Sequence, residues 1–306
     1  MYKRAIVRIP CKNIVNGLTT AKLGKPDYEK AIEQHSRYIE ALRELGLEVI
    51  VLKADENFPD STFVEDTAVF TPHCAIICNP GALSRKGEIF EITQVLEKYF
   101  EYIEQIKNPG TVDGGDILRI GTHYFIGISE RTNSIGAQQF ISILNRYNFS
   151  GATISLKQVL HLKSGAAYLE KNNLVVSGEF IEKPEFKNFN LIKIDEDEGY
   201  ATNCIWINQK VLIAKGFPKT RSAIEKAGYK TIELDVSEFR KVDGGLSCLS
   251  LRFWEMGKDI ALLKCNSELF LNKCNSCPKS KNILTANSTN FSNYTNFIFS
   301  KLAKLD

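Results

Sequence analysis

Apolar runs of strand length alternate along the chain with segments whose apolar residues recur at helical spacing. The strand-length runs cover residues 4–10, 47–52, 67–71 and 74–78. The helix-spaced segments cover residues 26–46, 86–99, 134–147 and 218–227. Apolar residues three and four positions apart line one face of a helix, whereas short apolar runs bounded by turn residues are typical of strands. The alternation of the two patterns predicts an α/β protein.

Polar turns interrupt the predicted strands at a nearly regular interval. They are centred on Glu65, Asp113, His161, Asn203 and Asp243, with spacings of 48, 48, 42 and 40 residues. Repeating units of roughly 45 residues are typical of arrays whose units share one core. We therefore expect five units in a closed, pseudo-fivefold ring, each sending one turn toward a central channel. Such a channel is a usual place for a small-ligand site.

The regular pattern ends near Phe253, which divides the chain into two predicted parts. Residues 1–253 form the expected main domain. Residues 254–306 include eight asparagines among 53 residues, and we interpret them as an extension whose composition favours disorder. The extension contains a C-x-x-C pair, Cys274 and Cys277, with Cys265 nearby. A structural zinc site needs four ligands, so three thiols without a histidine make zinc the less favoured interpretation.

Charge and cysteine usage narrow the class of protein. The net charge of +3 is too small to indicate nucleic-acid binding, and no run of 18 apolar residues is present to span a membrane. The first residues lack the apolar run of a signal peptide, and most cysteines lie in apolar strand-like runs, as free thiols do in a reducing compartment. We expect a cytoplasmic monomer or homodimer that acts on a small molecule.

Candidate chemistry is scattered over the turns. The acidic candidates are Asp60, Glu65, Asp66, Asp113 and Asp116. Desolvated carboxylates need a partner, which leaves a metal ion or a guanidinium or ammonium ligand as alternatives. Arg85 and Arg131 could hold a ligand carboxylate by bidentate hydrogen bonds. His161 and Cys248 are each more often core residues, yet together they form a possible base and nucleophile. The set as a whole fits a zwitterionic ligand.

Six segments in this order resemble the dimethylarginine dimethylaminohydrolase family. They read FVEDTAV, GTVDGGDIL, SERTN, LHLKSG, ATNCIWIN and VDGGLSCLSLRF, and the likeness covers roughly residues 4–253. The resemblance implies the five-bladed α/β propeller (pentein) fold of the guanidine-modifying enzyme superfamily. It also implies hydrolysis of N-omega-methylated arginines, with release of methylamine or dimethylamine and citrulline, through a covalent thiouronium on a cysteine. No metal or organic cofactor is implied.

The resemblance also assigns roles to individual residues. Cys248 would be the nucleophile, and His161 the proton donor and then the base. Asp113 would be the acidic partner that orients His161 or holds a guanidinium nitrogen, at a position where some bacterial relatives have Glu. The residues implied to bind the cationic groups of the substrate are Asp60, Glu65 and Asp66. Arg85 and Arg131 would bind its carboxylate. Backbone groups of Leu18, in a predicted lid, and of Val242 would complete the pocket.

Two further hypotheses concern the state of the thiol and the type of activity. An acidic, empty pocket should raise the pKa of Cys248, because like charge disfavours the thiolate. A related arginine deiminase or citrulline-cleaving enzyme is one alternative, although we see no insertion between Glu65 and Asp113 of the kind that lengthens arginine deiminases. A non-catalytic pentein is another, and the joint presence of Cys248, His161 and Asp113 argues against it.

Overall fold

The structure is a computed structural model that describes residues 1–254, and the account below is confined to them. Apart from Trp254, the predicted extension lies outside the described residues, as do Cys265, Cys274 and Cys277. The interpretation of residues 254–306 as a separate, disordered extension therefore stays a prediction.

Five three-stranded sheets share one topology. In each, a short inner strand pairs antiparallel with a middle strand, and the middle strand pairs parallel with an outer strand. The inner strands are β3 (Ala68–Phe70), β6 (Ile117–Ile120), β9 (Ala166–Tyr168), β12 (Ile205–Ile207) and β15 (Leu251–Phe253). The middle strands are β4 (Cys74–Ile77), β7 (His123–Ile128), β10 (Asn173–Ser177), β13 (Lys210–Ala214) and β1 (Arg4–Arg8). The outer strands are β5 (Tyr102–Gln105), β8 (Ser150–Ser155), β11 (Asn190–Ile194), β14 (Lys230–Leu234) and β2 (Glu48–Leu52).

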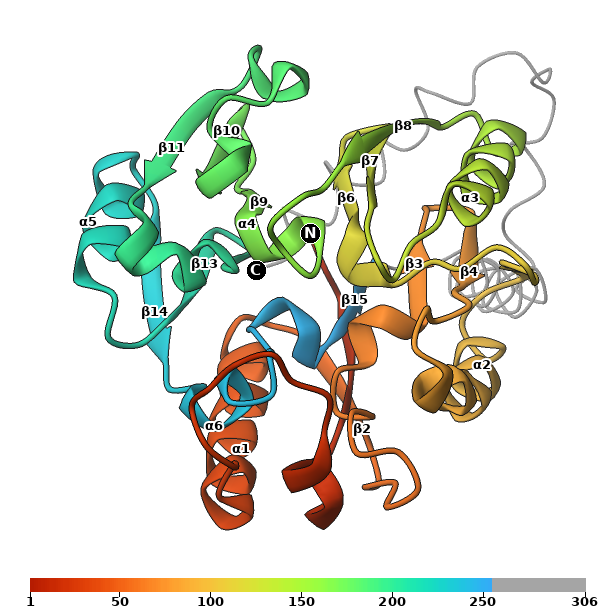
Figure 1. Cartoon of the computed structure of the whole chain (residues 1–306), viewed down its shortest axis with the longest axis horizontal. Helices are drawn as coiled ribbons and strands as arrows, with labels where there is room; N and C mark the ends of the chain where they lie inside the picture. The colour runs from red at the N-terminus through yellow and green to blue at the C-terminus, as the bar shows by residue number, and fades with distance from the viewer. Residues whose placement is uncertain (255–306) are drawn as a thin grey trace, which may run out of the picture. The chain divides into compact units, whose positions relative to one another are not determined.

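The two ends of the described chain close the ring of sheets. β15 pairs antiparallel with β1, with Arg4 opposite Phe253 and Ile6 opposite Leu251. The fifth unit therefore takes its inner strand from the end of the domain and its other two strands from the beginning. Figure 1 shows the five units arranged around a common centre. The predicted pseudo-fivefold α/β propeller is confirmed.

Helices connect the middle and outer strands of four units and lie toward the periphery in Figure 1. They are α1 (Tyr28–Glu44), α2 (Ile89–Leu96), α3 (Ser134–Arg146) and α5 (Pro218–Lys226). In the remaining unit, built from β9, β10 and β11, the connection is made by two 3₁₀ turns, η5 (Gly178–Phe180) and η6 (Pro184–Phe186).

The observed helix ends follow local signals. Asp27 caps α1 by accepting a hydrogen bond from the Lys30 amide, and Asn133 caps α3 in the same way through the Gly136 amide. The prediction of one helix over residues 86–99 is wrong at both ends. The first part is instead the 3₁₀ helix η3 (Leu83–Glu88), where a side chain on Gly87 would collide with the ring of Phe58.

Packing of α1 fixes the end of the chain that carries Cys248. Tyr38 of α1 is fully buried, and its hydroxyl hydrogen-bonds the Leu246 carbonyl at 3.0 Å and the Ser250 hydroxyl at 2.7 Å. Burial of such a side chain contributes about 1.5–3 kcal/mol. These contacts hold η8 (Ser247–Leu249) against the core from behind.

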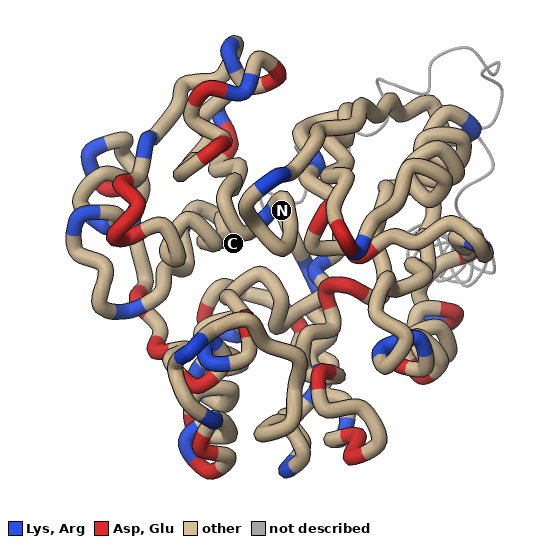
Figure 2. Tube along the Cα trace, viewed as in Figure 1, with Lys and Arg blue, Asp and Glu red and all other residues tan. Residues whose placement is uncertain are grey.

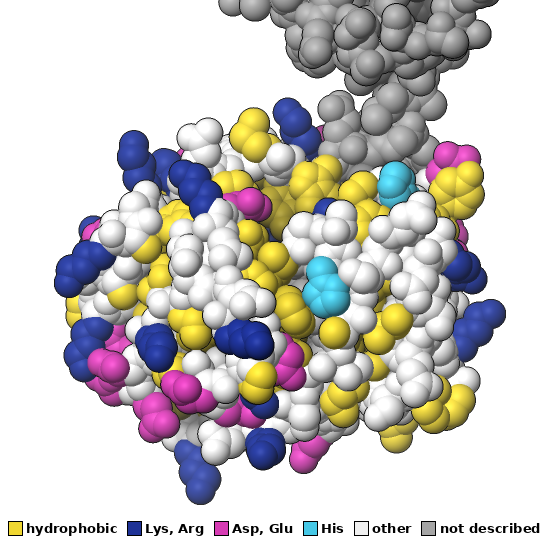
Figure 3. Space-filling model, turned by 90° about the horizontal axis from the view of Figure 1, so that it is seen from above, with side chains coloured by type: hydrophobic (Ala, Val, Ile, Leu, Met, Phe, Trp, Pro, Cys, Tyr) yellow, Lys and Arg dark blue, Asp and Glu magenta, His cyan; other side chains and the backbone are white. Residues whose placement is uncertain are grey.

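Charged side chains are distributed differently at the centre and on the surface. Figure 2 shows acidic residues gathered where the turns meet at the centre, with basic residues beside them. On the face in Figure 3, basic and acidic side chains are interspersed. No helix among residues 1–254 has the length and apolar character needed to cross a membrane.

Candidate active site

A short helical turn or polar loop leads into each inner strand and brings polar side chains to the centre of the ring. The turns are η2 (Val64–Thr67), η4 (Gly114–Asp116), α4 (Leu162–Gly165), η7 (Glu196–Thr202) and η8. Because each inner strand has only three or four residues, the polar residues that precede it stay close to the shared axis. The five turns predicted from the sequence are thus the ones that converge, with Cys248 rather than Asp243 lying on η8.

One cavity joins the candidate reactive residues. It has a volume of about 720 Å³ and is called the Cys248 cavity below. Its wall includes Glu65, Gly115, His161, Lys163, Asn203, Ser247, Cys248 and Asp243, with residues 20–23 over one side. Of the predicted site residues, Glu65, His161 and Cys248 line it directly. Asp113 touches it through His161, while Leu18, Asp60, Asp66, Arg85, Arg131 and Val242 do not line it.

His161 and Asp113 form a buried hydrogen-bonded pair. The His161 Nε2 lies 3.1 Å from the Asp113 Oδ2, and the other Asp113 oxygen accepts a hydrogen bond from the Gly81 amide at 2.8 Å. Burial opposes a charge on the ring, but the nearby carboxylates of Asp66, Asp116 and Asp113 outweigh it and raise the pKa of His161 to about 9. At neutral pH the resting imidazole therefore carries a proton that it can donate.

Asp116 holds the backbone that carries His161. Its Oδ1 accepts a hydrogen bond from the Leu162 amide at 3.0 Å, and its Oδ2 accepts one from the Ser129 hydroxyl at 2.6 Å. Gly115 lies against the same imidazole, since a side chain there would come within 2.8 Å of the His161 Nδ1. The sequence Val-Asp-Gly-Gly occurs twice in the chain, at residues 112–115 and 242–245. In the first of these turns the lack of a side chain on Gly115 leaves room for the histidine ring.

Cys248 is a half-buried free thiol on η8. Its sulfur accepts a hydrogen bond from the Gly245 amide at 3.4 Å. Burial, with the negative charges of Glu65 and Asp66, raises the pKa of Cys248 to about 12. The predicted direction of the shift is confirmed, and burial is a larger cause than the acidic field. In the ligand-free protein the nucleophile candidate is therefore a neutral thiol.

Glu65 forms the floor of the Cys248 cavity with three partners that the sequence analysis did not identify. Its Oε1 accepts from Lys163 at 2.7 Å and from Arg252 at 3.2 Å, and its Oε2 accepts from the Ser247 hydroxyl at 2.6 Å. Lys163 and Arg252 lie inside the recognised segments LHLKSG and SLRF, so their positions were visible but their partner was not.

Asn203 ties two turns together at this floor. Its amide donates to the Lys163 carbonyl at 2.9 Å and to the Ser247 hydroxyl at 3.0 Å, and its oxygen accepts from the Ser247 amide at 2.9 Å. A side chain at Gly245 would come within 2.5 Å of the Asn203 oxygen. The second Gly-Gly pair therefore lets Asn203 approach η8, as the first lets His161 approach η4.

Asp66 and Arg85 are paired with each other behind the cavity. The Arg85 Nη1 lies 2.6 Å from the Asp66 Oδ2, and Arg85 also binds both oxygens of Glu88. The second Asp66 oxygen accepts from the Gly115 amide at 2.8 Å. Burial alone would raise the pKa of Asp66, but the charges of His161 and Arg85 lower it to about 2. Arg85, predicted to hold a ligand carboxylate, is thus already engaged by protein carboxylates.

The remaining predicted binding residues meet around Gly17. The Asp60 Oδ1 accepts a hydrogen bond from the Leu18 amide at 3.0 Å. A side chain at Gly17 would lie 2.9 Å from that oxygen and 3.3 Å from Val242. Burial raises the pKa of Asp60, and the charges of Arg85 and Arg131 oppose this rise. The Arg131 side chain makes no hydrogen bond or ion pair with another residue of the described part of the chain. Arg131 therefore differs from Arg85 in having a guanidinium available to a ligand.

The segment after Leu18 reaches across to the second Val-Asp-Gly-Gly turn. The Thr19 hydroxyl donates to the Lys241 carbonyl at 2.9 Å, and the amide and hydroxyl of Thr20 both donate to the Asp243 carboxylate. Asp243 has a φ of +56°, a left-handed conformation that costs free energy in a residue other than glycine. Where the first turn presents its aspartate to His161, the second presents its aspartate to the predicted lid.

The alternative of a metal site can be compared with this geometry. Asp66, Asp113 and His161 could present ligand atoms within 4.8 Å of one another. Both carboxylates, however, already accept hydrogen bonds from backbone amides, and each also has a charged or imidazole partner. The hydrogen-bond network accounts for the cluster without an ion, and a cationic ligand is the better candidate for the neighbouring cavity.

A sequence profile and two sequence relatives of this chain carry the name of the same enzyme family. A sequence profile described as "N,N dimethylarginine dimethylhydrolase, eukaryotic" matches residues 19–251. The chain is 52% identical to the N(G),N(G)-dimethylarginine dimethylaminohydrolase of Pseudomonas aeruginosa over 254 residues, which cover 83% of this chain and 100% of that protein. The Streptomyces coelicolor protein of the same name is 32% identical over 256 residues, covering 83% of this chain and 98% of its own.

A solved structure agrees with the sequence relatives. A cysteine-to-serine mutant of the Pseudomonas aeruginosa enzyme, complexed with citrulline, superposes with a TM-score of 0.82 at 51% identity. The match covers 83% of this chain and 100% of that one.

Proposed function

The chain belongs to the dimethylarginine dimethylaminohydrolase family, and we propose that it hydrolyses the guanidinium group of N-omega-methylated arginines. The products are citrulline and methylamine or dimethylamine. The observation that carries this proposal is that Cys248 and His161 line one cavity whose floor is the carboxylate of Glu65. Attack on a guanidinium carbon needs a nucleophile, a proton donor for the leaving amine and an anion beside the delocalised positive charge. Cys248, His161 and Glu65 can supply these three groups.

Electrostatics support binding of a cation beside Cys248. Glu65 and Asp66 both disfavour the thiolate of Cys248, so a guanidinium that enters the cavity offsets their charge. The substrate would thus help to form the nucleophile that attacks it. Positioned carboxylates also fix the plane of the guanidinium relative to the sulfur, which lowers the entropic part of the barrier.

The amino-acid end of the substrate would lie toward Gly17. We assign the α-ammonium to Asp60 and to backbone oxygens near Leu18 and Val242. The α-carboxylate is assigned to Arg131, whose guanidinium is free of described partners. Arg85 already binds Asp66 and Glu88, so it would reach the substrate carboxylate only by sharing its contact with Asp66.

The reaction proceeds in two steps, in which the guanidinium carbon is transferred first to the Cys248 sulfur and then to water. When the cationic substrate binds, the Cys248 thiol releases its proton to solvent, and the resulting thiolate adds to the guanidinium carbon. The C–N bond to the methylated nitrogen then breaks as the His161 imidazolium gives that nitrogen its proton. A thiouronium remains on the sulfur. The neutral imidazole then takes a proton from water as the water oxygen adds to the same carbon. Cleavage of the C–S bond releases citrulline and returns Cys248, while Asp113 keeps His161 oriented throughout.

We also place the protein in the cytoplasm. The described cysteines, Cys11, Cys74, Cys78, Cys204 and Cys248, are all free thiols, which suits a reducing compartment.

Product analysis tests the proposed function. The protein is incubated separately with dimethylarginine, monomethylarginine and arginine, and the released amine and citrulline are measured. We expect dimethylamine and methylamine in equal amounts to citrulline, with arginine a poor substrate. Release of ammonia from arginine as the fastest reaction would instead identify an arginine deiminase. Cys248→Ser should abolish all product formation.

A further inference from the structure

A second cavity opens on the other side of the Glu65 floor. Its volume is about 390 Å³, and it is called the rear cavity below. All five inner strands contribute to its wall. Each supplies at least one partly exposed side chain, and these are Val69, Arg119, Tyr168, Trp206 and Arg252. The centre of the ring is therefore aromatic and cationic at this end.

The rear cavity is separate from the Cys248 cavity. Glu65, Lys163 and Ser247 line both cavities, and hydrogen bonds from Lys163 and Ser247 to Glu65 join these three side chains between them. Cys248 and His161 line only the Cys248 cavity. A ligand in the rear cavity would thus lie outside the site proposed for the reaction.

Arg119 of β6 brings a cation to this cavity without an acidic partner. Its Nε donates to the Gly121 carbonyl at 2.9 Å, while its Nη1 is buried and has no hydrogen-bond partner among the described residues. The guanidinium carbon lies 4.2 Å from the ring centre of Trp254, which leaves its edge for a ligand. A buried donor that makes no hydrogen bond is destabilising, most of all when it is charged.

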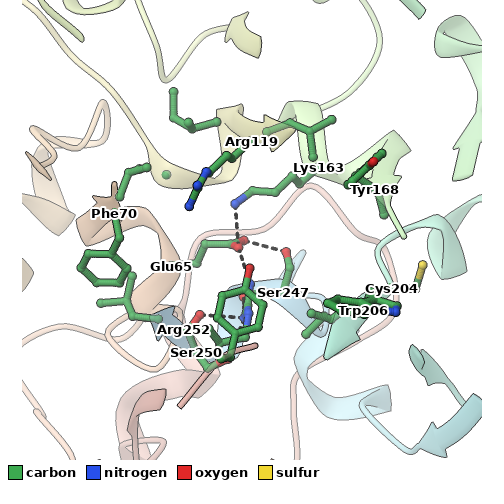
Figure 4. A pocket seen from close by; sticks show the side chains of 18 of the residues that line it. Glu65, Phe70, Arg119, Lys163, Tyr168, Cys204, Trp206, Ser247, Ser250 and Arg252 are labelled. Carbon is green, nitrogen blue, oxygen red and sulfur yellow. Dashed lines mark hydrogen bonds and ion pairs between the residues drawn. The ribbon is translucent and has the colours of Figure 1, made fainter. Parts of the chain in front are cut away.

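The other cations of the rear cavity are only partly neutralised. Arg252 binds Glu65, but its Nε is also buried without a hydrogen-bond partner among residues 1–254. Lys163 shares the same Glu65 oxygen. Figure 4 shows the guanidinium of Arg119 and the ammonium of Lys163 directed into the same space, with the Glu65 carboxylate below Lys163. Among the lining residues, Glu170 is the one other acid, and it is exposed.

We propose that the rear cavity binds a small carboxylate whose body is planar and apolar. The carboxylate would accept hydrogen bonds from the edge of the Arg119 guanidinium that faces this space and from the ammonium of Lys163. Arginine favours planar oxyanions through paired hydrogen bonds. Phe70, Tyr168 and Trp206 offer ring surfaces to the body of the ligand. The volume is in the range of small-molecule sites, and an aromatic acid matches both features.

Tryptophan fluorescence can report binding in the rear cavity. Its sequence has two tryptophans, Trp206 and Trp254, and both line the rear cavity. Benzoate is therefore titrated into the full chain while tryptophan fluorescence is recorded. Benzamide, which has the same ring and no charge, serves as the paired probe. We expect a saturable change with benzoate and none with benzamide at the same concentrations.

Variants and a competitor locate the binding. Arg119→Gln should weaken benzoate binding about tenfold or more, since a hydrogen bond to a charged group contributes roughly 1.5–3 kcal/mol. Arg146→Gln removes an exposed arginine from the surface of α3 and should leave benzoate affinity unchanged. Saturating citrulline, aimed at the Cys248 cavity, should also leave it unchanged. The thermal midpoint of Arg119→Gln establishes that the variant is folded.

Several results would overturn the proposal. The proposal is wrong if benzoate gives no saturable fluorescence change, or if benzamide binds as tightly as benzoate. It is also wrong if saturating citrulline abolishes benzoate binding, or if folded Arg119→Gln binds benzoate with wild-type affinity. If Arg119→Gln fails to fold, the comparison of benzoate with benzamide in the wild-type chain, with and without citrulline, decides the question alone.

Discussion

At the scale of single residues, the protonation states of Cys248 and His161 define the resting site. The thiol is held neutral by burial and by acidic neighbours, and the imidazole is held charged by Asp66, Asp116 and Asp113. The site therefore differs from a preformed thiolate–imidazolium pair, in which the charge of the histidine lowers the pKa of the cysteine enough to ionise it. Here the imidazole is charged but the thiol stays neutral. In the proposed reaction, the ligand supplies the positive charge that the thiolate needs.

Alkylation of Cys248 by iodoacetamide should therefore be slow at neutral pH and should accelerate as pH rises toward the limit of protein stability. The reason is that the thiol pKa of about 12 leaves little thiolate at pH 7. The pH dependence of the alkylation rate gives the measurement, with Cys248→Ser subtracting reaction at other cysteines. An apparent Cys248 pKa well below about 8.5, the ordinary value of a cysteine thiol, in the ligand-free protein would contradict this prediction.

The sequence was sufficient to nominate Cys248, His161 and Asp113, because each lies in a segment with a recognisable pattern. It could not reveal Lys163 or Arg252 as partners of Glu65. Those contacts join residues separated by 98 and 187 positions, and they form only when the ring closes. A lone lysine or arginine beside a strand gives no local sign of such a partner.

At the scale of elements, the segment over residues 18–23 and the turn around Asp243 form a latch. Asp243 accepts two hydrogen bonds from Thr20 while it occupies a left-handed backbone conformation. The latch holds residues 20–23 against the Cys248 cavity and positions Leu18 beside Asp60. Asp243 was known from the sequence only as part of a repeated turn, since the chain that it holds lies more than 200 residues earlier.

Loosening this latch should weaken substrate use before it changes the chemistry. In Asp243→Gly the backbone strain is relieved but both hydrogen bonds to Thr20 are lost, so we expect KM to rise several-fold and the segment near Leu18 to become more sensitive to proteases. Steady-state kinetics and limited proteolysis measure the two effects. Asp197→Asn, at an exposed acid paired with Lys219, is the matched control.

The latch interpretation fails if Asp243→Gly keeps the wild-type KM and the wild-type pattern of proteolysis. A fall in kcat alone would also contradict it, because that result would point to a role in the chemical step.

The regular helices and strands were largely predictable, whereas the turns that carry the site were not. Helix-spaced segments gave α1, α3 and α5 to within two residues at each end. The functional turns are 3₁₀ or single-turn segments of three to seven residues, too short to show periodicity. Their shape depends on packing between neighbouring units, as with Gly115 against His161 and Gly245 against Asn203.

At the scale of the whole molecule, the ring depends on the pairing of β15 with β1. Phe253 at the end of β15 is fully buried and packs against the rings of Phe70, Tyr99 and Phe100 at 5.3–5.5 Å between ring centres. β15 begins two residues after η8 ends. The pairing that closes the ring therefore also fixes the position of Cys248. The spacing of turns predicted a ring, but the strand that closes it could be identified only from the structure.

Removing the side chain of Phe253 should therefore destabilise the folded protein. Phe253→Ala should lower the free energy of unfolding by about 3–5 kcal/mol, because it opens a cavity under β15. Phe90→Ala, at a site that is 70% exposed, should change it by less than about 0.5 kcal/mol. Urea unfolding followed by circular dichroism measures both. Similar small effects for the two variants would show that β15 does not secure the ring.

The central claim is that Cys248 carries the covalent intermediate in hydrolysis of methylated arginine. It is tested most directly by mixing the full chain with dimethylarginine, quenching during turnover with acid, and mapping the peptides by mass spectrometry. The account predicts a thiouronium adduct on the Cys248 peptide of the wild-type protein, formed as fast as dimethylamine appears and absent from Cys248→Ser. Citrulline formed at the wild-type rate by Cys248→Ser, or an adduct on another residue that forms and decays with turnover, would contradict it.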